Sequence, residues 1–536
     1  MLTRPTPSAF PTRAVALPAS FRRLLARAGR LARKLWPLWW LGLGWWLRVL
    51  SFGRFPLRED EALYAYWARL ISSGKDPMLE RVAVDKPPFF IYSLAHLFTA
   101  FGPSEAVGRW LNVGCSMLAL LLLWLLARRL YGRTTAHLAL ALYAISPFAI
   151  SFAPTLYTDP MLVAWLLLAL VCAAYGLGLA AGLAAGMAFA TKQNALLFLP
   201  LVVAVLALAR AWRWPGRVGR ALPEPRGTAA RVLRMAGFAG GFAYTWYKVW
   251  QWDGWRILPA EIPSFWQQAW NSYGGLHRVP VQQWGERGLA WWGVVRWLGG
   301  WLPGTMILLG LAGLALAAAL RRRGRPGDAR GAIWDRLLGG FVLGYLGLHV
   351  VLSFQPWDRY LLGLAPVLAL LAARGVLYGR RALGEGGLRR GVAAALVAST
   401  LLWGAWLAAT ARIPVGGDHG AYTGIDVVAA YLRTAVPAQR GVLYHRWLGW
   451  HWNWYLWDGP QGRVYWSDPE MLVTDIRRNP YGYRRFIVFP AWHLAERDPV
   501  EAALRDIGFQ MQERLRVRAG DEVRFVVFQI LPEVQP

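Results

Sequence analysis

Long apolar runs separated by short polar segments dominate the first three quarters of the chain. The runs at 111–127, 161–174, 195–209, 306–320 and 392–409 approach the ~20 residues that cross a hydrocarbon core. Many of the runs are bounded by arginines rather than by polar amphipathic faces, which favours a multi-pass membrane protein over a buried globular core. We therefore predict a mainly α fold, a transmembrane bundle of about eleven helices. They are expected near residues 37–50, 107–127, 136–152, 160–177, 179–191, 195–210, 235–250, 303–320, 337–353, 361–377 and 391–410.

From about Arg412 the pattern changes to short runs with frequent, mixed charge. Segments of strand character alternate there with segments of helical periodicity, which is typical of a small α/β domain. The strand-like runs are 441–444, 463–466, 486–489 and 523–530, and the helical ones are 425–434, 469–478 and 499–507. The chain is thus expected to comprise a basic segment (1–35), a transmembrane domain (36–411) and an α/β domain (412–536).

The net charge of +29 is concentrated in the short segments between apolar runs. Of the 59 Lys and Arg residues, 29 lie in the windows 1–35, 128–133, 210–234, 321–336 and 374–390, with only four acidic residues. Lys and Arg in short loops mark the cytoplasmic side of a membrane protein. The distribution of the basic residues therefore predicts a protein of the cell membrane that contacts membrane lipids. It does not indicate a nucleic-acid partner. The N-terminus is expected in the cytoplasm, and an odd number of spans puts the α/β domain outside.

An acidic pair, Asp60-Glu61, follows the first apolar run and falls on the predicted outer side. One carboxylate beside an acceptor hydroxyl or amine can act as a general base. A helix start is the alternative, because acids stabilise the first turn and residues 61–71 have helical spacing. Either role, or both, fits the pair.

The same outer segment contains Asp85-Lys86-Pro87-Pro88. Lys86 can neutralise a phosphate as a point charge, and Asp85 can bind a divalent cation or orient the lysine. The two prolines fix the backbone and disfavour helix before them. A surface ion pair ahead of a proline-started helix is the alternative.

Four more residues lie at predicted outer ends of helices. Asp159 directly precedes Pro160. It could cap the helix that begins there, or it could be a functional residue, because charged side chains within the membrane region are often functional. Lys192 is the only basic residue in 179–209, and it either reaches the interface or meets an anionic head group. Arg359 and Tyr360 pose the same choice, although Asp358 could simply pair with Arg359.

Read in order, these motifs resemble a known family. The acidic pair, Asp85-Lys86-Pro87-Pro88, Thr158-Asp159, Thr191-Lys192-Gln193 and Arg359-Tyr360-Leu361-Leu362 are similar to the pattern of family-39 glycosyltransferases of the GT-C class. That family includes dolichyl-phosphate-mannose–protein mannosyltransferases and bacterial lipid A aminoarabinose transferases. The similarity covers residues 54–210 well and 353–372 loosely, whereas the α/β domain matches only in position.

The resemblance implies an inverting transfer of a sugar from a polyprenyl-phosphate donor to an acceptor on the outer face. The acceptor would be a lipid, a protein or a cell-envelope polymer. Asp60 would be the base with Glu61 beside it, and Asp159 would line the acceptor site. Lys86 and Tyr360 would hold the donor phosphate, with Arg359 and Lys192 as further candidates from their charge and position. The basic charge near a leaving phosphate agrees with this chemistry.

A divalent metal is the one cofactor that the resemblance implies. Family members with Glu-Lys-Pro-Pro hold a metal with that Glu and a loop His. Here Asp85 replaces the Glu, and His277 corresponds only by lying in the matching loop. A lone His without a partner at metal spacing is the alternative for His277.

Two other function classes fit some of the same features. A transporter or flippase for a lipid-linked or anionic solute would line a cavity with these charges, but the sequence shows no internal hydropathy symmetry that would favour it. A non-enzymatic envelope assembly protein would use the outer domain to bind glycan or partners. Clustering of Asp60, Lys86 and Asp159 at one outward site would favour the enzyme.

Overall fold

The computed structural model describes residues 35–209, 227–272, 275–321, 329–384, 386–437, 439–459, 462–479 and 482–533. The predicted basic N-terminal segment, apart from its last residue, lies outside these ranges. So do parts of the predicted basic loops at 210–226 and 322–328.

A helix is found at each predicted transmembrane position. The first covers residues 35–49. The others are α4 (Glu105–Tyr131), α5 (Arg133–Ala144) with α6 (Pro147–Phe152), α7 (Asp159–Ala174), α8 (Gly178–Thr191), η1 (Gln193–Phe198) with α9 (Leu199–Leu208), α11 (Thr228–Gly254), α14 (Leu302–Arg321), α15 (Ala329–Val351), η4 (Asp358–Leu364) with α16 (Ala365–Ala382), and α17 (Gly387–Ala409). The expected single helix at 136–152 is split in two, because Pro147 has no N–H to continue α5 and instead starts α6.

Within the described residues, four helical segments are long and apolar enough to cross a membrane: α4, α14, η4–α16 and α17. Four shorter segments in this part of the chain are also apolar: α3 (Pro88–Phe101), α7, α8 and η1–α9. Of the four long segments, η4–α16 is the most enclosed by its neighbours. The segment that carries Arg359 and Tyr360 therefore forms the centre of the bundle.

Glycines allow α8 and α11 to pack with their backbones in contact. Gly178, Gly182 and Gly186 recur every fourth residue along one face of α8. A Cβ atom at Gly182 would lie 2.1 Å from the carbonyl oxygen of Phe238 in α11. Small residues at this spacing drive close helix packing in membranes, where apolar burial gives little preference for one partner.

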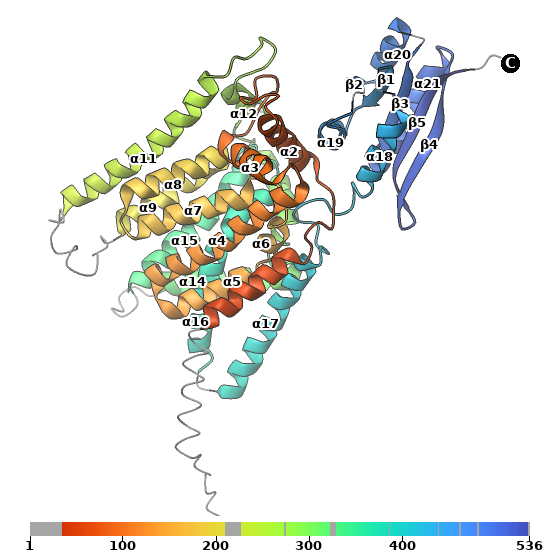
Figure 1. Cartoon of the computed structure of the whole chain (residues 1–536). Helices are drawn as coiled ribbons and strands as arrows, with labels where there is room; N and C mark the ends of the chain where they lie inside the picture. Colours follow the sequence, from red (N-terminus) through yellow and green to blue (C-terminus); the bar gives the residue numbers. More distant parts are fainter. Residues whose placement is uncertain are drawn as a thin grey trace, which may run out of the picture.

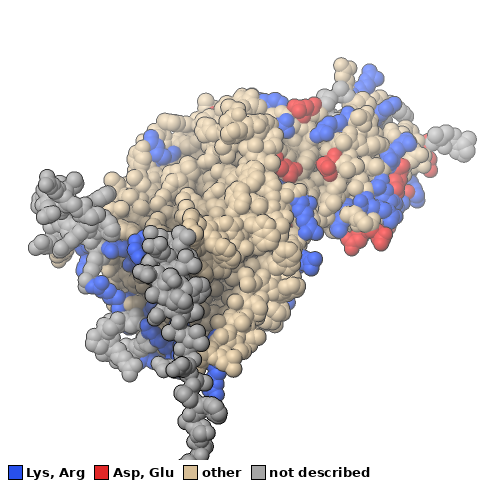
Figure 2. All heavy atoms as spheres, turned by 60° about the horizontal axis from the view of Figure 1, so that its bottom comes forward, with Lys and Arg blue, Asp and Glu red and all other residues tan. Residues whose placement is uncertain are grey.

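The two ends of the bundle differ in charge and in the elements that cover them. Helices α2 (Glu59–Ser72), α3 (Pro88–Phe101) and α12 (Phe265–Ser272) cover the end near the sheet domain (Figure 1). The short η2 (Val281–Gln283) and α13 (Trp284–Val295) follow α12 in the chain. The links from α4 to α5 and from α16 to α17, which were predicted to be cytoplasmic, lie at the opposite end (Figure 1). Figure 2 shows an almost uncharged surface on the bundle between these ends, and mixed charge on the sheet domain.

The C-terminal part folds around a five-stranded sheet in the order β2-β1-β3-β5-β4. Strands β1 (Gly441–His445), β2 (Gly462–Tyr465) and β3 (Arg484–Pro490) are parallel, and β4 (Phe509–Ala519) and β5 (Glu522–Pro532) form an antiparallel hairpin. Helices α18 (Ile425–Ala435) and α19 (Gly449–Tyr455) bury their apolar sides on one face. Helices α20 (Pro469–Arg478) and α21 (Arg497–Arg505) do so on the other, and η5 (Ala491–Glu496) leads into α21. The predicted α/β domain is confirmed, with β4 and α19 as unpredicted additions.

Aromatic residues of α19 attach the sheet domain to the bundle. Trp454 stacks on Phe98 of α3, with ring centroids 5.7 Å apart. The Tyr455 hydroxyl donates to Glu105 at the start of α4 (2.6 Å). The guanidinium of Arg69 in α2 lies over Trp454 and also pairs with Asp458. The sheet domain is thereby held against α2, the helix that carries the acidic pair (Figure 1).

Candidate active site

Asp60 lies at the first turn of α2 and forms an ion pair with Arg359, 299 residues later in the chain. The guanidinium of Arg359 also lies over the rings of Trp357 (4.3 Å) and Tyr157 (5.3 Å). The side chain of Asp60 is 37% exposed, which makes it the most accessible member of the site's ion pairs. The pair joins α2 to η4 at the end of the bundle next to the sheet domain.

Glu61, the other half of the acidic pair, has a different environment. Its two carboxylate oxygens accept hydrogen bonds from the backbone N–H groups of Arg58 (3.0 Å) and Leu156 (2.8 Å). Burial raises the pKa of Glu61, although Arg109 and the two N–H groups oppose the shift. Glu61 therefore fixes the start of α2 to the turn before α7, the helix-start role that was the alternative to catalysis.

The loop between α2 and α3 delivers the second ion pair, between Lys86 and Asp85. Both side chains are mostly buried, with 9% of Lys86 and 17% of Asp85 exposed. Pro87 and Pro88 start α3 directly after them, as predicted. The side chain of Gln193 donates to the Asp85 carbonyl, which ties this loop to the end of α8.

Asp159 and Lys192 form the third ion pair, at the deepest position. The Lys192 ammonium lies 2.7 and 2.8 Å from the two carboxylate oxygens of Asp159. Only 2–3% of either side chain is exposed. Lys192 is therefore enclosed with Asp159 inside the bundle, and its contact with an anionic head group stays a prediction. Asp159 lies in the first turn of α7 with Thr158 at the cap position, so its carboxylate can face Lys192.

Tyr360 connects the deep pair to the rest of the site. Its ring is buried, and the Lys192 ammonium lies 5.2 Å from the ring centroid. The Tyr345 hydroxyl of α15 donates to the Tyr360 carbonyl (2.8 Å). Because η4 carries Arg359 and Tyr360 side by side, one segment contacts both the exposed and the buried ion pair.

The three pairs act on one another electrostatically. Burial raises the pKa of Asp60, but Arg359 and Lys86 outweigh it and hold that pKa below its usual value, with a further contribution from Lys192. The ionisation of Asp60 on α2 therefore depends on charges from three other segments: the α2–α3 loop, the α8–η1 link and η4. Asp60 and Lys86 are thus linked to each other directly, and Asp60 is linked to Asp159 through Lys192.

The residues present do not fit the metal site that the resemblance implies. Asp85 is engaged by Lys86. The exposed His277 ring lies 2.9 Å from the Gly275 carbonyl, through Nδ1, and its backbone N–H donates to Ser353. Among the residues that the structure describes, no group of three or more His, Cys, Asp and Glu side chains could hold a metal ion. A metal bound by Asp85 and His277 stays a prediction without structural support.

Several residues at the site were missed from the sequence. Tyr422, just before α18, donates its hydroxyl to Glu59, the neighbour of Asp60. Its ring stacks on His451 of α19, with centroids 4.3 Å apart. The Asp358 carboxylate accepts from the backbone N–H groups of Arg359 and Gly416, whereas a simple ion pair with the Arg359 guanidinium was one of the alternatives left open by the sequence. Glu59 and Asp358 are charged and directly precede Asp60 and Arg359, which could have drawn attention to them. The sequence does not show, however, which distant segments they contact.

Comparison with known proteins supports this architecture. Residues 85–218 match the family described as dolichyl-phosphate-mannose-protein mannosyltransferase. No curated protein sequence matches the chain.

Solved structures match over nearly the full length. ArnT from Cupriavidus metallidurans bound to undecaprenyl phosphate is 16% identical, with a TM-score of 0.53 over 96% of this chain and 98% of that one. Its apo form gives 15% identity and a TM-score of 0.54 over 95% and 98%. The Archaeoglobus fulgidus oligosaccharyltransferase in complex with Zn and sulfate gives 13% identity and a TM-score of 0.50 over 91% and 72%.

At these identities the structural matches establish the fold. The chain therefore has the fold of the GT-C membrane glycosyltransferases, and its residues 85–218 match the protein mannosyltransferase family within that class.

Proposed function

We propose that this protein is a membrane glycosyltransferase that moves a sugar from a polyprenyl-phosphate donor to an acceptor on the outer face. The observation that carries the proposal is the convergence of three carboxylates and three cations at one end of the bundle. Asp60, Asp85 and Asp159 pair there with Arg359, Lys86 and Lys192. A lipid donor approaching from the bilayer needs no nucleotide-binding domain, only cations for its phosphate.

The exposed pair suggests how the phosphate would bind. Arg359 has a planar guanidinium that suits phosphate oxygens, and Lys86 supplies a second positive charge. A donor phosphate would compete with the Asp60 carboxylate for Arg359. Binding would thus release Asp60 from its ion pair and raise its basicity at the moment when an acceptor proton must be removed.

In the transfer step, the acceptor atom forms a bond to the anomeric carbon as the bond from that carbon to the phosphate oxygen breaks. Asp60 takes the proton of the acceptor, and the bonding electron pair leaves with the polyprenyl phosphate. Lys86 and Arg359 stabilise the charge that develops on the leaving phosphate. Attack opposite the leaving group inverts the anomeric configuration. No step is routed through a metal ion.

The buried pair would have a supporting role. Asp159 and Lys192 neutralise each other at the bottom of the site, and Lys192 contacts the ring of Tyr360. We propose that this pair fixes the position of η4, so that Arg359 can contact the donor phosphate. Asp159 would line the acceptor side, as predicted, while bound to Lys192.

The topology belongs to the same proposal. The basic loops would face the cytoplasm, and the sheet domain, attached beside Asp60 through Tyr422 and α19, would lie outside and contact the acceptor. A single cysteine introduced at the exposed Trp492 should react with a membrane-impermeant maleimide in intact cells. Labelling only after permeabilisation would overturn this orientation.

Mass spectrometry tests the function and identifies the acceptor. Lipids, glycans and glycoproteins are compared between cells that have the chain and cells that lack it. We expect one glycosylated product to be lost and its polyprenyl-phosphate sugar to accumulate. The wild-type chain should restore the product, and Asp60→Asn should not. Unchanged profiles in all three strains, or restoration by Asp60→Asn, would contradict the proposal.

A further inference from the structure

The loop that carries Asp85 and Lys86 is fixed at its middle in an unfavourable conformation. The carboxylate of Asp76 accepts from the backbone N–H groups of Glu80 (2.8 Å) and Arg81 (2.9 Å), which makes a tight turn. Inside that turn, Leu79 is fully buried with φ of 55°, in the left-handed region. A bulky side chain is disfavoured in this region and persists there only when surrounding contacts enforce it.

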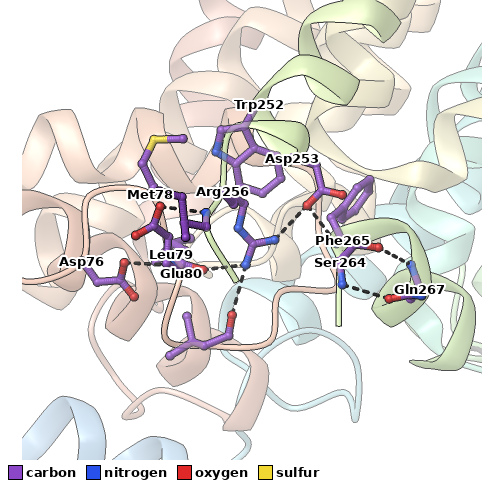
Figure 3. A network of polar contacts seen from close by, with 12 residues as sticks. Asp76, Met78, Leu79, Glu80, Trp252, Asp253, Arg256, Ser264, Phe265 and Gln267 are labelled. Atoms are coloured by element: carbon purple, nitrogen blue, oxygen red, sulfur yellow. Dashed lines mark hydrogen bonds and ion pairs between the residues drawn. The ribbon is translucent and has the colours of Figure 1, made fainter. Parts of the chain in front are cut away.

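Arg256, just beyond α11, provides those contacts. Its guanidinium donates to the carbonyl oxygens of Leu79 (2.5 Å) and Val82 (3.2 Å), and to the carboxylate of Asp253 (3.0 Å). The side chain of Arg256 is fully buried. Figure 3 shows the guanidinium pointing from the end of α11 into the loop. We call the hydrogen bonds of Arg256 to the loop the clamp. The Asp253 carboxylate also accepts from the backbone N–H of Phe265 (3.0 Å), which connects the clamp to α12 (Figure 3).

Further bonds from the same element secure the loop on both sides of Leu79. The backbone N–H of Ile257 donates to the Glu80 carboxylate (2.9 Å). The indole N–H of Trp252 donates to the Tyr92 hydroxyl (3.0 Å), which in turn donates to the Pro77 carbonyl (2.8 Å). The position of the loop therefore depends on the end of α11 and not on the short connection from α2 alone.

A second arginine holds the other cation-bearing segment in the same manner. Arg287 of α13 donates to the carbonyl oxygens of His349, Val350, Leu352 and Phe354, at distances of 2.6–3.0 Å. That stretch leads directly into η4, where Arg359 and Tyr360 lie. Both arginines come from the region between α11 and α14, and both bind backbone carbonyls rather than the site itself.

We propose that Arg256 and Arg287 are positioning residues that hold Lys86 and Arg359 at the separation that a donor phosphate requires. This inference rests on the proposed function, since it assigns the clamped segments to phosphate binding. Each arginine satisfies several acceptors at once through its fork of N–H groups. A lysine has a single ammonium and cannot span the same set of carbonyls. Arg→Lys exchanges therefore keep the charge and remove the clamp.

Binding of undecaprenyl phosphate to the purified full chain tests the proposal. We expect Arg256→Lys and Arg287→Lys each to weaken binding about tenfold, because Lys86 or Arg359 is displaced. The matched control is Arg48→Lys. Arg48 is also fully buried and donates to backbone carbonyls, those of Gly44, Tyr143 and Ala144, away from the two segments. This control should lose thermal stability and keep its affinity.

A double-variant comparison separates positioning from general destabilisation. If Arg256 acts through Lys86, Arg256→Lys should weaken binding no further once Lys86→Ala is present. The proposal would be overturned if the affinity losses of the two single variants multiplied in the double variant. It would also be overturned if Arg256→Lys and Arg287→Lys bound undecaprenyl phosphate like the wild type. If Arg256→Lys does not fold, the half-buried Arg287 supplies the same test, with Arg359→Ala as its partner.

Failure of the proposed function would look different. In that case the wild type and Lys86→Ala would show the same affinity for undecaprenyl phosphate, or none, and the clamp assignment would fall with it. The clamp alone would be refuted if the wild type bound undecaprenyl phosphate, Lys86→Ala did not, and Arg256→Lys kept the affinity of the wild type.

Discussion

Two ion pairs of the candidate site have similar chemistry and opposite surroundings. Asp60–Arg359 lies at the mouth of the site, at the end of the bundle next to the sheet domain, where 37% of the carboxylate side chain is exposed. Asp159–Lys192 lies at the bottom, where only 2–3% of either side chain is exposed. The partners of the first pair are 299 residues apart in the chain, whereas those of the second are 33 residues apart, on α7 and just after the next helix, α8.

The difference in burial separates an exchangeable pair from a fixed one. The Asp60 carboxylate keeps part of its contact with water, whereas the Arg359 side chain is only 11% exposed. A partly solvated carboxylate loses less on leaving the pair than a fully buried one, so a competing anion can replace it. A buried pair is held because either partner alone would be a charge without solvent, which costs several kcal/mol. The mouth pair is therefore suited to binding and proton transfer, and the deep pair to holding the site together. The predictions below test that division.

The largest effect is expected from Asp60→Asn. Asparagine has the same shape but cannot take the acceptor proton, so transfer should fall by up to about 10⁴-fold, or ~5.5 kcal/mol in barrier height. Thermal stability should change little, because Asp60 is partly exposed. The measurement is the single-turnover rate with a polyprenyl-phosphate sugar and the acceptor identified by mass spectrometry.

Glu59→Gln is the matched control for Asp60→Asn. Glu59 is the neighbouring acid on α2, pairs with Arg58 and is 46% exposed, but it contacts Tyr422 rather than the cation cluster. Its transfer rate should stay within a few-fold of the wild type. Full activity of Asp60→Asn would remove Asp60 from the role of base and end the functional distinction between the two pairs.

The contrast between these pairs also shows what the sequence could predict. The length of the apolar runs and the arginines that separate them predicted a helical segment at each position of the bundle, since both follow from the bilayer itself, but they did not predict the break between α5 and α6. Strand β4 was missed, although its residues alternate in polarity over 509–519. Helix α19 has seven residues rich in tryptophan, with no helical period to detect.

The sequence singled out the charged residues that the structure brings together and allowed for the Asp85–Lys86 ion pair, but it did not show the partners of Arg359 and Lys192. For Arg359, the adjacent Asp358 was the natural expectation, whereas the guanidinium meets Asp60 on another element. Lys192 was expected near the interface and is buried against Asp159. A local pattern indicates which residues carry charge near the outer face. Which pairs form depends on how α2, α7 and η4 pack, and that is set by contacts across the whole bundle.

The second effect concerns the deep pair. Lys192→Met leaves the buried Asp159 carboxylate without a cation, so we expect a loss of about 3–4 kcal/mol in stability. The measurement is thermal unfolding in detergent, compared with the wild type. The double variant Asp159→Asn, Lys192→Met removes both charges and should recover most of the loss. Equal stability of the wild type and Lys192→Met would show that the deep pair is no more structural than the exposed one.

The third effect is a change of binding at the mouth. Arg359→Lys keeps the charge but loses the planar group that stacks on Trp357 and Tyr157. We expect the KM for the donor to rise about tenfold, or ~1.4 kcal/mol, with a smaller change in kcat. Arg58→Lys is the control, since Arg58 is 48% exposed and pairs with Glu59. A fall in kcat at constant KM would assign Arg359 to the chemical step instead of donor binding.

The smallest effect is a displacement of pH profiles. Asp60 works only when ionised, so the rate is lost as pH falls through its pKa. Burial raises that pKa, but Arg359 and Lys86 together hold it below the usual value in the free protein, and kcat/KM reports this state. In the complex the phosphate has taken Arg359, so the pKa reported by kcat is higher. The acid limb of kcat should therefore lie roughly one pH unit above that of kcat/KM. Arg359→Gln, which removes the cation in both states, should bring the two limbs together by moving the kcat/KM limb upward. Coincident limbs in the wild type would mean that donor binding leaves the Asp60–Arg359 pair closed, which would make the mouth pair as fixed as the buried one.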